Sequence, residues 1–125
     1  MRPILTALAC VAALAVVAGC GESDQEQARE VAQDYVDARN AGDFEAVCAL
    51  YSDQFKQELG TADCAAFVRE QTAGSDESLS LVDVRVRKDV ATADLDVTRG
   101  ETQGPSRIVI RLERQDGDWA ITSLQ

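Results

Sequence analysis

The chain of 125 residues contains no histidine, and its 12 basic residues are outnumbered by 22 acidic ones, which gives a formal net charge of −10. The excess of negative charge argues against a nucleic-acid partner, because nucleic acids are bound by basic patches. Without histidine, the chain lacks a common zinc ligand and the side chain most often used for acid–base catalysis near neutral pH. The length predicts a single domain.

The N-terminal segment has almost no charge, since Arg2 is the only charged side chain before Glu22. Its apolar run, residues 4–17, is shorter than the roughly 20 apolar residues that a membrane-spanning helix needs. A positive start, a short apolar core and small residues after it are typical of an export signal that a peptidase removes. We therefore predict that residues 1–19 are a cleaved signal peptide, and the alternative is an uncleaved membrane anchor.

The segment ends in Val17-Ala18-Gly19-Cys20, which resembles the lipobox of bacterial lipoproteins. The resemblance implies that the Cys20 thiol takes a diacylglyceryl group and that Cys20 becomes the first residue of the mature protein. Stable anchoring generally takes more than one acyl chain, and a lipidated Cys20 would carry two or three. We expect an extracytoplasmic protein attached to the cell membrane through Cys20. Residues 20–23 would form a very short tether, and residues 24–125 a single domain almost on the bilayer.

Cys48 and Cys64 are the cysteines that remain after export, because Cys10 leaves with the signal peptide and Cys20 is acylated. An oxidising compartment favours a disulfide between them. Two free buried thiols are one alternative, and half of a metal site is the other. Zinc would need four ligands, and no histidine is present to supplement the pair. We therefore predict a disulfide, with no metal and no other cofactor.

Amphipathic periodicity predicts a helix from Asp24 to about Ala41, and the S-x-x-E spacing of Ser23 and Glu26 marks its start as a capping box. The apolar residues of this helix recur at intervals of three and four and are Ala28, Val31, Ala32, Tyr35 and Val36. Three shorter helices are predicted at residues 44–51, 53–59 and 62–71, with Asp43, Ser52 and Thr61 as their caps. The predicted disulfide would join the second and fourth helices.

The hydrophobic period changes from 3.6 to 2 after a loop predicted at residues 73–78. A first hairpin is predicted with Val86 opposite Ala91, Val84 opposite Ala93 and Val82 opposite Leu95. After a loop at residues 99–105, a second hairpin is predicted with Arg114 opposite Trp119 and Leu112 opposite Ile121. These registers give the sheet one apolar and one charged face, which predicts an α+β fold with the N-terminal helices packed on an antiparallel sheet.

Three segments together resemble small exported lipoproteins of the nuclear transport factor 2-like, or SnoaL-like, superfamily. They are VAQDYVDARNAGDFEAVCALYS (residues 31–52), the helix-borne cysteine pair with ADCAAFV (62–68), and the closing hairpin LERQDGDWAITSL (112–124). The resemblance implies a cone-like fold, in which a curved antiparallel sheet wraps around the helices and leaves a pocket at its open end. Members include ketosteroid isomerase, polyketide cyclases, dehydratases and many non-catalytic binding domains, and a fold alone does not choose among them.

Six side chains are candidates for lining such a pocket: Tyr35, Arg39, Tyr51, Phe55, Phe67 and Trp119. For the aromatic residues the simpler role is to fill the core of a small domain, and for Arg39 it is to be a cation in the last helical turn. An acid–base enzyme of the ketosteroid-isomerase or polyketide-cyclase type is disfavoured, because no carboxylate falls on the predicted apolar faces. We expect a non-catalytic binding module for an apolar small molecule or lipid, and the alternative is a domain that binds an envelope protein.

Overall fold

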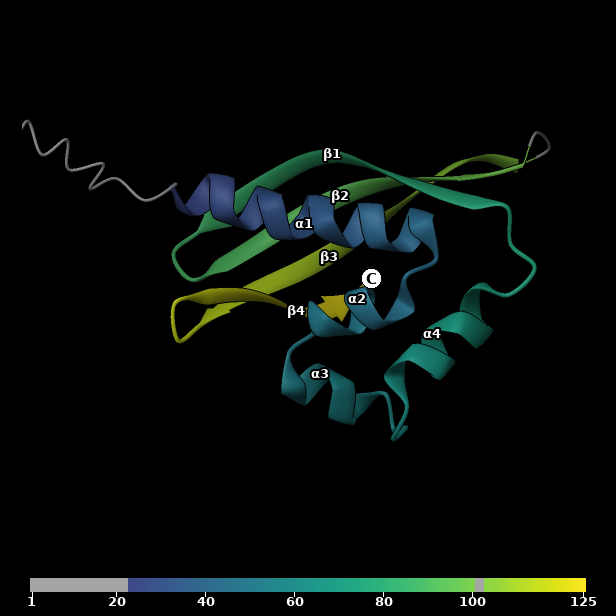
Figure 1. The fold of residues 1–125 in the computed structure, drawn as a ribbon. Helices are drawn as coiled ribbons and strands as arrows, with labels where there is room; N and C mark the ends of the chain where they lie inside the picture. Colours follow the sequence, from purple (N-terminus) through teal and green to yellow (C-terminus); the bar gives the residue numbers. More distant parts are fainter. Residues whose placement is uncertain (1–22, 101–102) are drawn as a thin grey trace, which may run out of the picture.

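A computed structural model describes residues 23–100 and 103–125, which form helices on one face of a four-stranded sheet (Figure 1). In chain order the elements are α1 (Asp24–Ala41), α2 (Phe44–Ala49), α3 (Asp53–Glu58), α4 (Cys64–Thr72), β1 (Glu77–Arg87), β2 (Val90–Arg99), β3 (Gln103–Gln115) and β4 (Asp118–Leu124). The strands are antiparallel and lie in the order β1-β2-β3-β4. The predicted α+β fold is therefore confirmed.

Parts of the predicted organisation lie outside the described residues. These are the predicted signal peptide at residues 1–19, the lipobox cysteine Cys20, and residues 101–102 of the β2–β3 connection. Among the helices that the structure does describe, none is both long enough and apolar enough to cross a membrane.

Helix α1 packs along the inner face of the sheet, and its buried residues are Ala28, Ala32, Tyr35, Val36 and Ala38. The Ser23 hydroxyl oxygen accepts a hydrogen bond from the Glu26 N–H at 3.2 Å, as the capping box predicts. Gly42, with a φ of 71°, ends the helix in the left-handed conformation that favours glycine. Beside this end, the Asn40 amide donates to the Leu79 carbonyl at 2.9 Å and accepts from the Leu79 N–H at 2.8 Å. These two bonds fix the end of α1 against the first residues of β1.

The register of β1 with β2 follows the prediction near the turn and departs from it further along. A bulge between Leu81 and Asp83 places Leu81, and not Val82, opposite Leu95, so the predicted Val82–Leu95 pair is wrong. A bulge adds one residue to a strand, which reverses the faces of all side chains beyond it. Val82 is consequently 42% exposed, and Leu79 is buried in its place.

The second hairpin has the predicted register, with Arg114 opposite Trp119 and Leu112 opposite Ile121. The strands are longer than predicted, because β1 begins at Glu77 and β2 continues to Arg99, where composition indicated loops. Pairing with the neighbouring strand extends the ladder into these polar residues, whose own preference for β structure is weak. As a result, Glu77 and Arg99 lie opposite each other at one end of the sheet.

The outer edge of β4 is partly covered by the segment that connects α2 to α3. The Ile121 N–H donates to the Leu50 carbonyl at 2.8 Å, and the Ser52 N–H donates to the Ile121 carbonyl at 2.9 Å. Tyr51, which lies between Leu50 and Ser52 in the chain, forms a parallel bridge with Ile121. The bridge fixes the Tyr51 ring against the inner face of the sheet, where the residue is buried.

The short helices agree with the prediction except at the start of α4. Asp43 and Ser52 cap α2 and α3 as predicted, and both helices end slightly before their predicted positions. The cap of α4 is Asp63 and not Thr61, because the Asp63 carboxylate accepts from the Ala66 N–H at 3.0 Å. The Thr61 hydroxyl instead accepts from the Asp63 N–H at 3.2 Å, two residues before the observed cap. A disulfide joins Cys48 on α2 to Cys64 on α4, as predicted.

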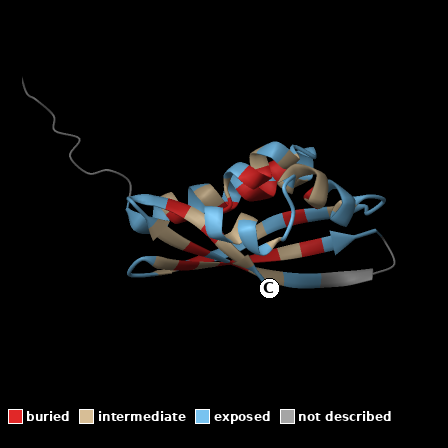
Figure 2. Ribbon diagram, turned by 90° about the horizontal axis from the view of Figure 1, so that it is seen from below, coloured by how far each residue is buried: buried red, intermediate tan, exposed pale blue. Residues whose placement is uncertain are grey.

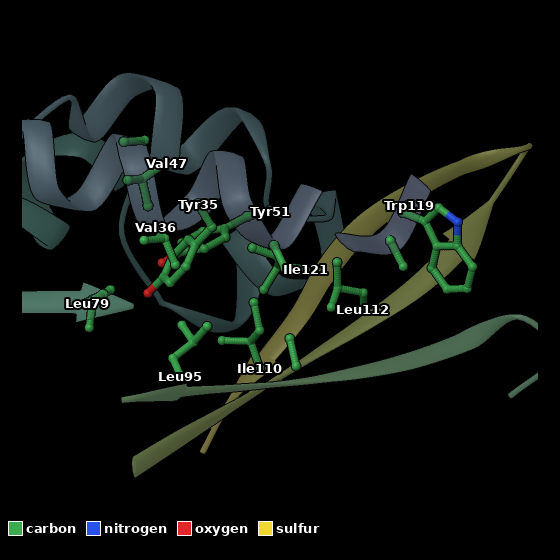
Figure 3. Close-up of a cluster of buried hydrophobic side chains, with 14 of the residues drawn as sticks. Tyr35, Val36, Val47, Tyr51, Leu79, Leu95, Ile110, Leu112, Trp119 and Ile121 are labelled. Carbon is green, nitrogen blue, oxygen red and sulfur yellow. The ribbon is translucent and has the colours of Figure 1, made fainter. Parts of the chain in front are cut away.

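The core lies between the helices and the inner face of the sheet, where Figure 2 shows the buried residues of the two layers facing each other. Its largest fully buried side chains are Tyr35, Leu95, Ile110, Leu112, Ile121, Val47 and Val97. Figure 3 shows Tyr35 and Tyr51 together near one end of this cluster and Trp119 at the other. The two tyrosines and the tryptophan therefore lie in different parts of the core, and Tyr51 borders a cleft.

Candidate functional site

A cleft of about 200 Å³ lies at the end of the domain where α1 ends, next to helix α4. We call it the α4 cleft. Its apolar lining consists of Tyr51, Leu59, Phe67, Val68 and Leu124. Its polar lining consists of Arg39, Gln71, Thr72, Glu77 and Arg99. Residues from the first helix and the last strand thus meet here, and they offer both apolar and charged surface to anything that enters. We call Arg39, Glu77 and Arg99 the charged side of the cleft.

Glu77 connects the two arginines of the charged side. Its Oε1 accepts from Arg39 Nη2 at 3.2 Å, and its Oε2 accepts from Arg99 Nε at 3.0 Å. Arg39 has a second partner in the core, because its Nη1 donates to the hydroxyl of the buried Tyr35 at 2.8 Å. The side chains of Arg39 and Glu77 are only 14% and 15% exposed, whereas that of Arg99 is 54% exposed. Two arginines and one glutamate leave a local positive charge on a protein that is strongly negative overall.

Two buried tyrosines lie behind this charged side. The ring centroids of Tyr35 and Tyr51 are 6.4 Å apart, and Phe55 packs edge-on against Tyr51 at 4.7 Å. Burial raises the pKa of Tyr51, and its interaction with the Tyr35 hydroxyl raises that pKa further. Burial also raises the pKa of Tyr35, although the Arg39 guanidinium partly offsets this effect. Both hydroxyls therefore stay protonated near neutral pH, so neither of them is a base there.

We expect the domain to lose stability above about pH 10 because of these two tyrosines. An unfolded chain releases its phenol protons near pH 10, whereas the folded protein keeps them to higher pH, so the free energy of unfolding falls as the pH rises. Each of the two tyrosines lowers the free energy of unfolding by about 1.4 kcal/mol per pH unit, over the range between its pKa in the unfolded chain and its pKa in the folded protein. Denaturant unfolding from pH 8 to pH 11 measures the effect, and Tyr51→Phe should reduce the slope. Phenolate absorbance that rises near pH 10 while the circular dichroism stays native would contradict it.

Other hollows on the described surface combine fewer of these features. One of about 260 Å³ adjoins the α4 cleft and shares Arg39, Thr72 and Glu77 with it, but Phe44 and Leu79 are its only large apolar side chains. Among residues 23–100 and 103–125, no group of three carboxylate or cysteine side chains is arranged so that it could hold a metal ion. The α4 cleft is therefore the best candidate for a functional site in the described part of the chain.

The structure brings three of the six predicted pocket residues into the cleft, namely Arg39, Tyr51 and Phe67. Arg39 lies in the last turn of α1, as its simpler predicted role requires, and it also borders the cleft. Tyr35 is fully buried and reaches the cleft only through its hydrogen bond with Arg39. Tyr51 and Phe67 therefore supply the aromatic part of the site, and Tyr35 supports it from the core.

The other two candidates do not line the cleft. Phe55 packs against Tyr51 and borders a separate hollow beside β4. Trp119 lies at the far end of the core, where the Arg114 guanidinium carbon is 5.3 Å from the centre of its ring (Figure 3). Trp119 fills the core, which was the simpler of its two predicted roles.

The sequence pattern does not identify the other seven residues of the cleft lining, which are Leu59, Val68, Gln71, Thr72, Glu77, Arg99 and Leu124. The sequence around Glu77 and around Arg99 is typical of loops, and the approach of these two residues depends on the β1–β2 register. Leu124 is at the end of β4, and only the packing of α3 and α4 near this strand shows that it borders a cleft. A signal for Arg99 is nevertheless present in the sequence, because it follows directly on the alternating pattern of β2.

Comparison with known proteins identifies the fold. No protein-family model matches the chain, and no curated protein sequence matches it. A candidate ketosteroid isomerase from Kribbella flavida is 24% identical, with a TM-score of 0.55 over 80% of this chain and 78% of that one. An LEH-like epoxide hydrolase from M. tuberculosis is 13% identical, with a TM-score of 0.58 over 82% of each chain. A candidate dehydratase of the NTF2-like family from Streptomyces avermitilis is 19% identical, with a TM-score of 0.56 over 81% of this chain and 92% of that one.

These structures share the nuclear transport factor 2-like fold with this chain, and at such identities the likeness extends to the fold alone. Their names cover different activities, so the shared fold does not select one of them. The function must therefore be argued from the residues of the α4 cleft.

Proposed function

We propose that this nuclear transport factor 2-like domain is an extracytoplasmic, lipid-anchored binding module that holds a small, largely apolar molecule in the α4 cleft without transforming it. The observation that carries the proposal is the cleft itself. Tyr51, Phe67 and Leu124 turn apolar surface toward a hollow that opens to solvent beside the buried core. An apolar pocket with a few polar groups is the usual form of a small-molecule site.

The size of the cleft favours a small molecule over a membrane lipid. Its volume of about 200 Å³ is below the roughly 300–1,000 Å³ of pockets that hold drug-sized ligands. A lipid with two acyl chains would need a much larger cavity. We therefore narrow the expected ligand to a molecule with a body of one or two rings or a short chain.

Two features support binding without catalysis. Glu77 is the one carboxylate among the residues that line the cleft, and both of its oxygens accept hydrogen bonds from arginines. The raised pKa values of Tyr35 and Tyr51 keep their hydroxyls protonated, and the chain contains no histidine. A general base needs a free group that can accept a proton near the ligand, and neither Glu77 nor the tyrosines offer one.

The proposed anchor is tested by replacing Cys20. We expect Cys20→Ser to release the protein from the membrane fraction or to change its location, because the acyl chains would have no thiol to attach to. Cys10→Ser is the matched control, since Cys10 lies within the proposed signal peptide and should not affect anchoring. If Cys20→Ser is processed normally and still fractionates with membranes as the parent does, the lipobox interpretation is wrong.

The proposed binding is tested by native mass spectrometry of residues 21–125, which contain every described helix and strand. We expect a reproducible added mass after incubation with a lipid and metabolite extract of the source cell. Gln71→Trp should remove it by filling the cleft, and Glu70→Trp is the control on the same exposed part of α4, outside the cleft lining. A bare monomer with every extract would instead favour the alternative, a domain that binds an envelope protein.

A further inference from the structure

We infer that the α4 cleft selects molecules that carry a carboxylate on an apolar body, and that the Arg99 guanidinium binds this carboxylate. The inference rests on the proposed function and names the ligand class for the same site. Its basis is the pairing of a partly free arginine with an apolar wall in one small cleft. An arginine and an apolar wall are each common on protein surfaces. Together they match the carboxylate and the apolar body of the proposed ligand.

The charge of the cleft favours an anion. Two arginines and a single glutamate line it, and the protein around it has a net charge of −10. A cation would be attracted by the general surface but would meet Arg39 and Arg99 inside the cleft. An anion would be repelled by the surface as a whole but attracted by the two arginines of the cleft, so the cleft favours a carboxylate over a cation.

Arg99 is the arginine that is able to take a ligand. Arg39 already uses its Nη1 for the Tyr35 hydroxyl and its Nη2 for Glu77, and its side chain is largely buried. Arg99 uses only its Nε for Glu77, and its two Nη atoms have no partner among the described residues. The guanidinium fork binds a carboxylate through parallel N–H···O bonds, which are stronger than neutral hydrogen bonds. Glu77 would keep its own bonds and hold Arg99 in place while the ligand binds.

The position of the cleft in the molecule agrees with a water-soluble ligand. Helix α1 has 18 residues and is therefore about 27 Å long, and the cleft is at its C-terminal end. With an anchor just before the start of α1, the cleft would lie at the opposite end of this helix from the anchor. A carboxylate keeps a small apolar molecule soluble in the aqueous envelope, where this cleft would meet it.

The test compares ligands that differ only in the charged group. Isothermal titration of residues 21–125 with naphthoate, naphthalenemethanol and naphthylmethylamine varies the head group on one two-ring body, and benzoate and octanoate vary the body. We expect the best-fitting carboxylate to bind about tenfold more tightly than its alcohol, as a hydrogen bond to a charged group implies. The amine should bind more weakly than the alcohol.

Two substitutions then assign the preference to Arg99. Arg99→Gln should abolish the preference for the carboxylate while the alcohol binds as before, which also shows that the variant is folded. Arg107→Gln is the matched control, because Arg107 is 55% exposed and its Nε pairs with Asp96 at 3.2 Å, outside the cleft. This variant should bind all the ligands as the parent protein does.

Three results would overturn the inference, and they differ in what they say about the proposed function. If the carboxylate and the alcohol bind equally, or the amine binds best, the inference fails while the cleft remains a binding site. If Arg99→Gln keeps the preference, the carboxylate is bound by another group and the assignment to Arg99 fails. If none of the ligands binds and the native mass spectra also show a bare protein, the inference and the proposed function both fail.

Discussion

Replacing Cys48 and Cys64 together by alanine is expected to lower the free energy of unfolding by about 3 kcal/mol. The disulfide closes a loop with a sequence separation of 16, so its loss returns considerable conformational freedom to the unfolded chain. The effect should be largest at α4. Within that described helix Val68 alone is buried, and α4 packs mainly against α2, to which the disulfide ties it. Denaturant unfolding measures the total loss, and hydrogen exchange of α4 measures its local part.

Reduction of the parent protein provides the matched control for this double variant. Both treatments remove the same bond, so the two unfolding curves and the two exchange patterns should coincide. Because α4 supplies Phe67, Val68, Gln71 and Thr72 to the cleft, ligand binding should weaken together with the loss of protection. A loss of less than 1 kcal/mol, with α4 still protected from exchange, would contradict the role given to the disulfide.

Trp119→Ala is expected to cost about 3–5 kcal/mol of stability and to leave ligand binding unchanged. The side chain is buried at the end of the core remote from the cleft, and the Arg114 guanidinium lies over its ring. Truncation would open a large cavity there and remove the cation–π contact. Urea unfolding and titration with an aromatic alcohol separate the two effects.

Two further variants complete the comparison with Trp119→Ala. Trp119→Phe should cost less, because its indole N–H has no hydrogen-bond partner among the described residues and the ring volume is largely kept. Phe67→Ala should cost less stability than Trp119→Ala, since Phe67 is only partly buried, yet it should abolish binding. Loss of binding in Trp119→Ala at a temperature where it is fully folded would place the ligand site in the core and contradict the cleft.

The elements of the fold could be predicted because their hydrophobic periods are clear. The stripe of α1 and the alternation in β2 each fit one period over their whole length, and caps such as Ser23 and Ser52 fix helix starts. The bulge beside Val82 has no such signal, since valine suits either face of a strand and only the packing of Leu79 decides between them. Similarly, Thr61 and Asp63 are both good caps, and the observed hydrogen bonds select Asp63.

The candidate site was only partly predictable, for a related physical reason. Residue type alone marks Tyr51 and Phe67 as buried or pocket-lining, but it does not say at which end of the core each lies, so Trp119 was grouped with them. The pairing of Glu77 with Arg39 joins the start of β1 to the end of α1, and it depends on the position of the helix on the sheet. Such contacts between distant segments follow from the assembled fold and not from any local pattern.

A ¹H–¹⁵N NMR titration of residues 21–125 with an aromatic alcohol and its carboxylate analogue would locate the binding surface residue by residue. We expect the amide signals of Phe67, Val68, Gln71 and Thr72 to shift with both ligands, and the Arg99 side-chain signal to shift with the carboxylate alone. Signals from the outer face of the sheet, such as Arg107, should not move. Shifts confined to that outer face, or no shifts at all, would contradict a ligand site in the α4 cleft.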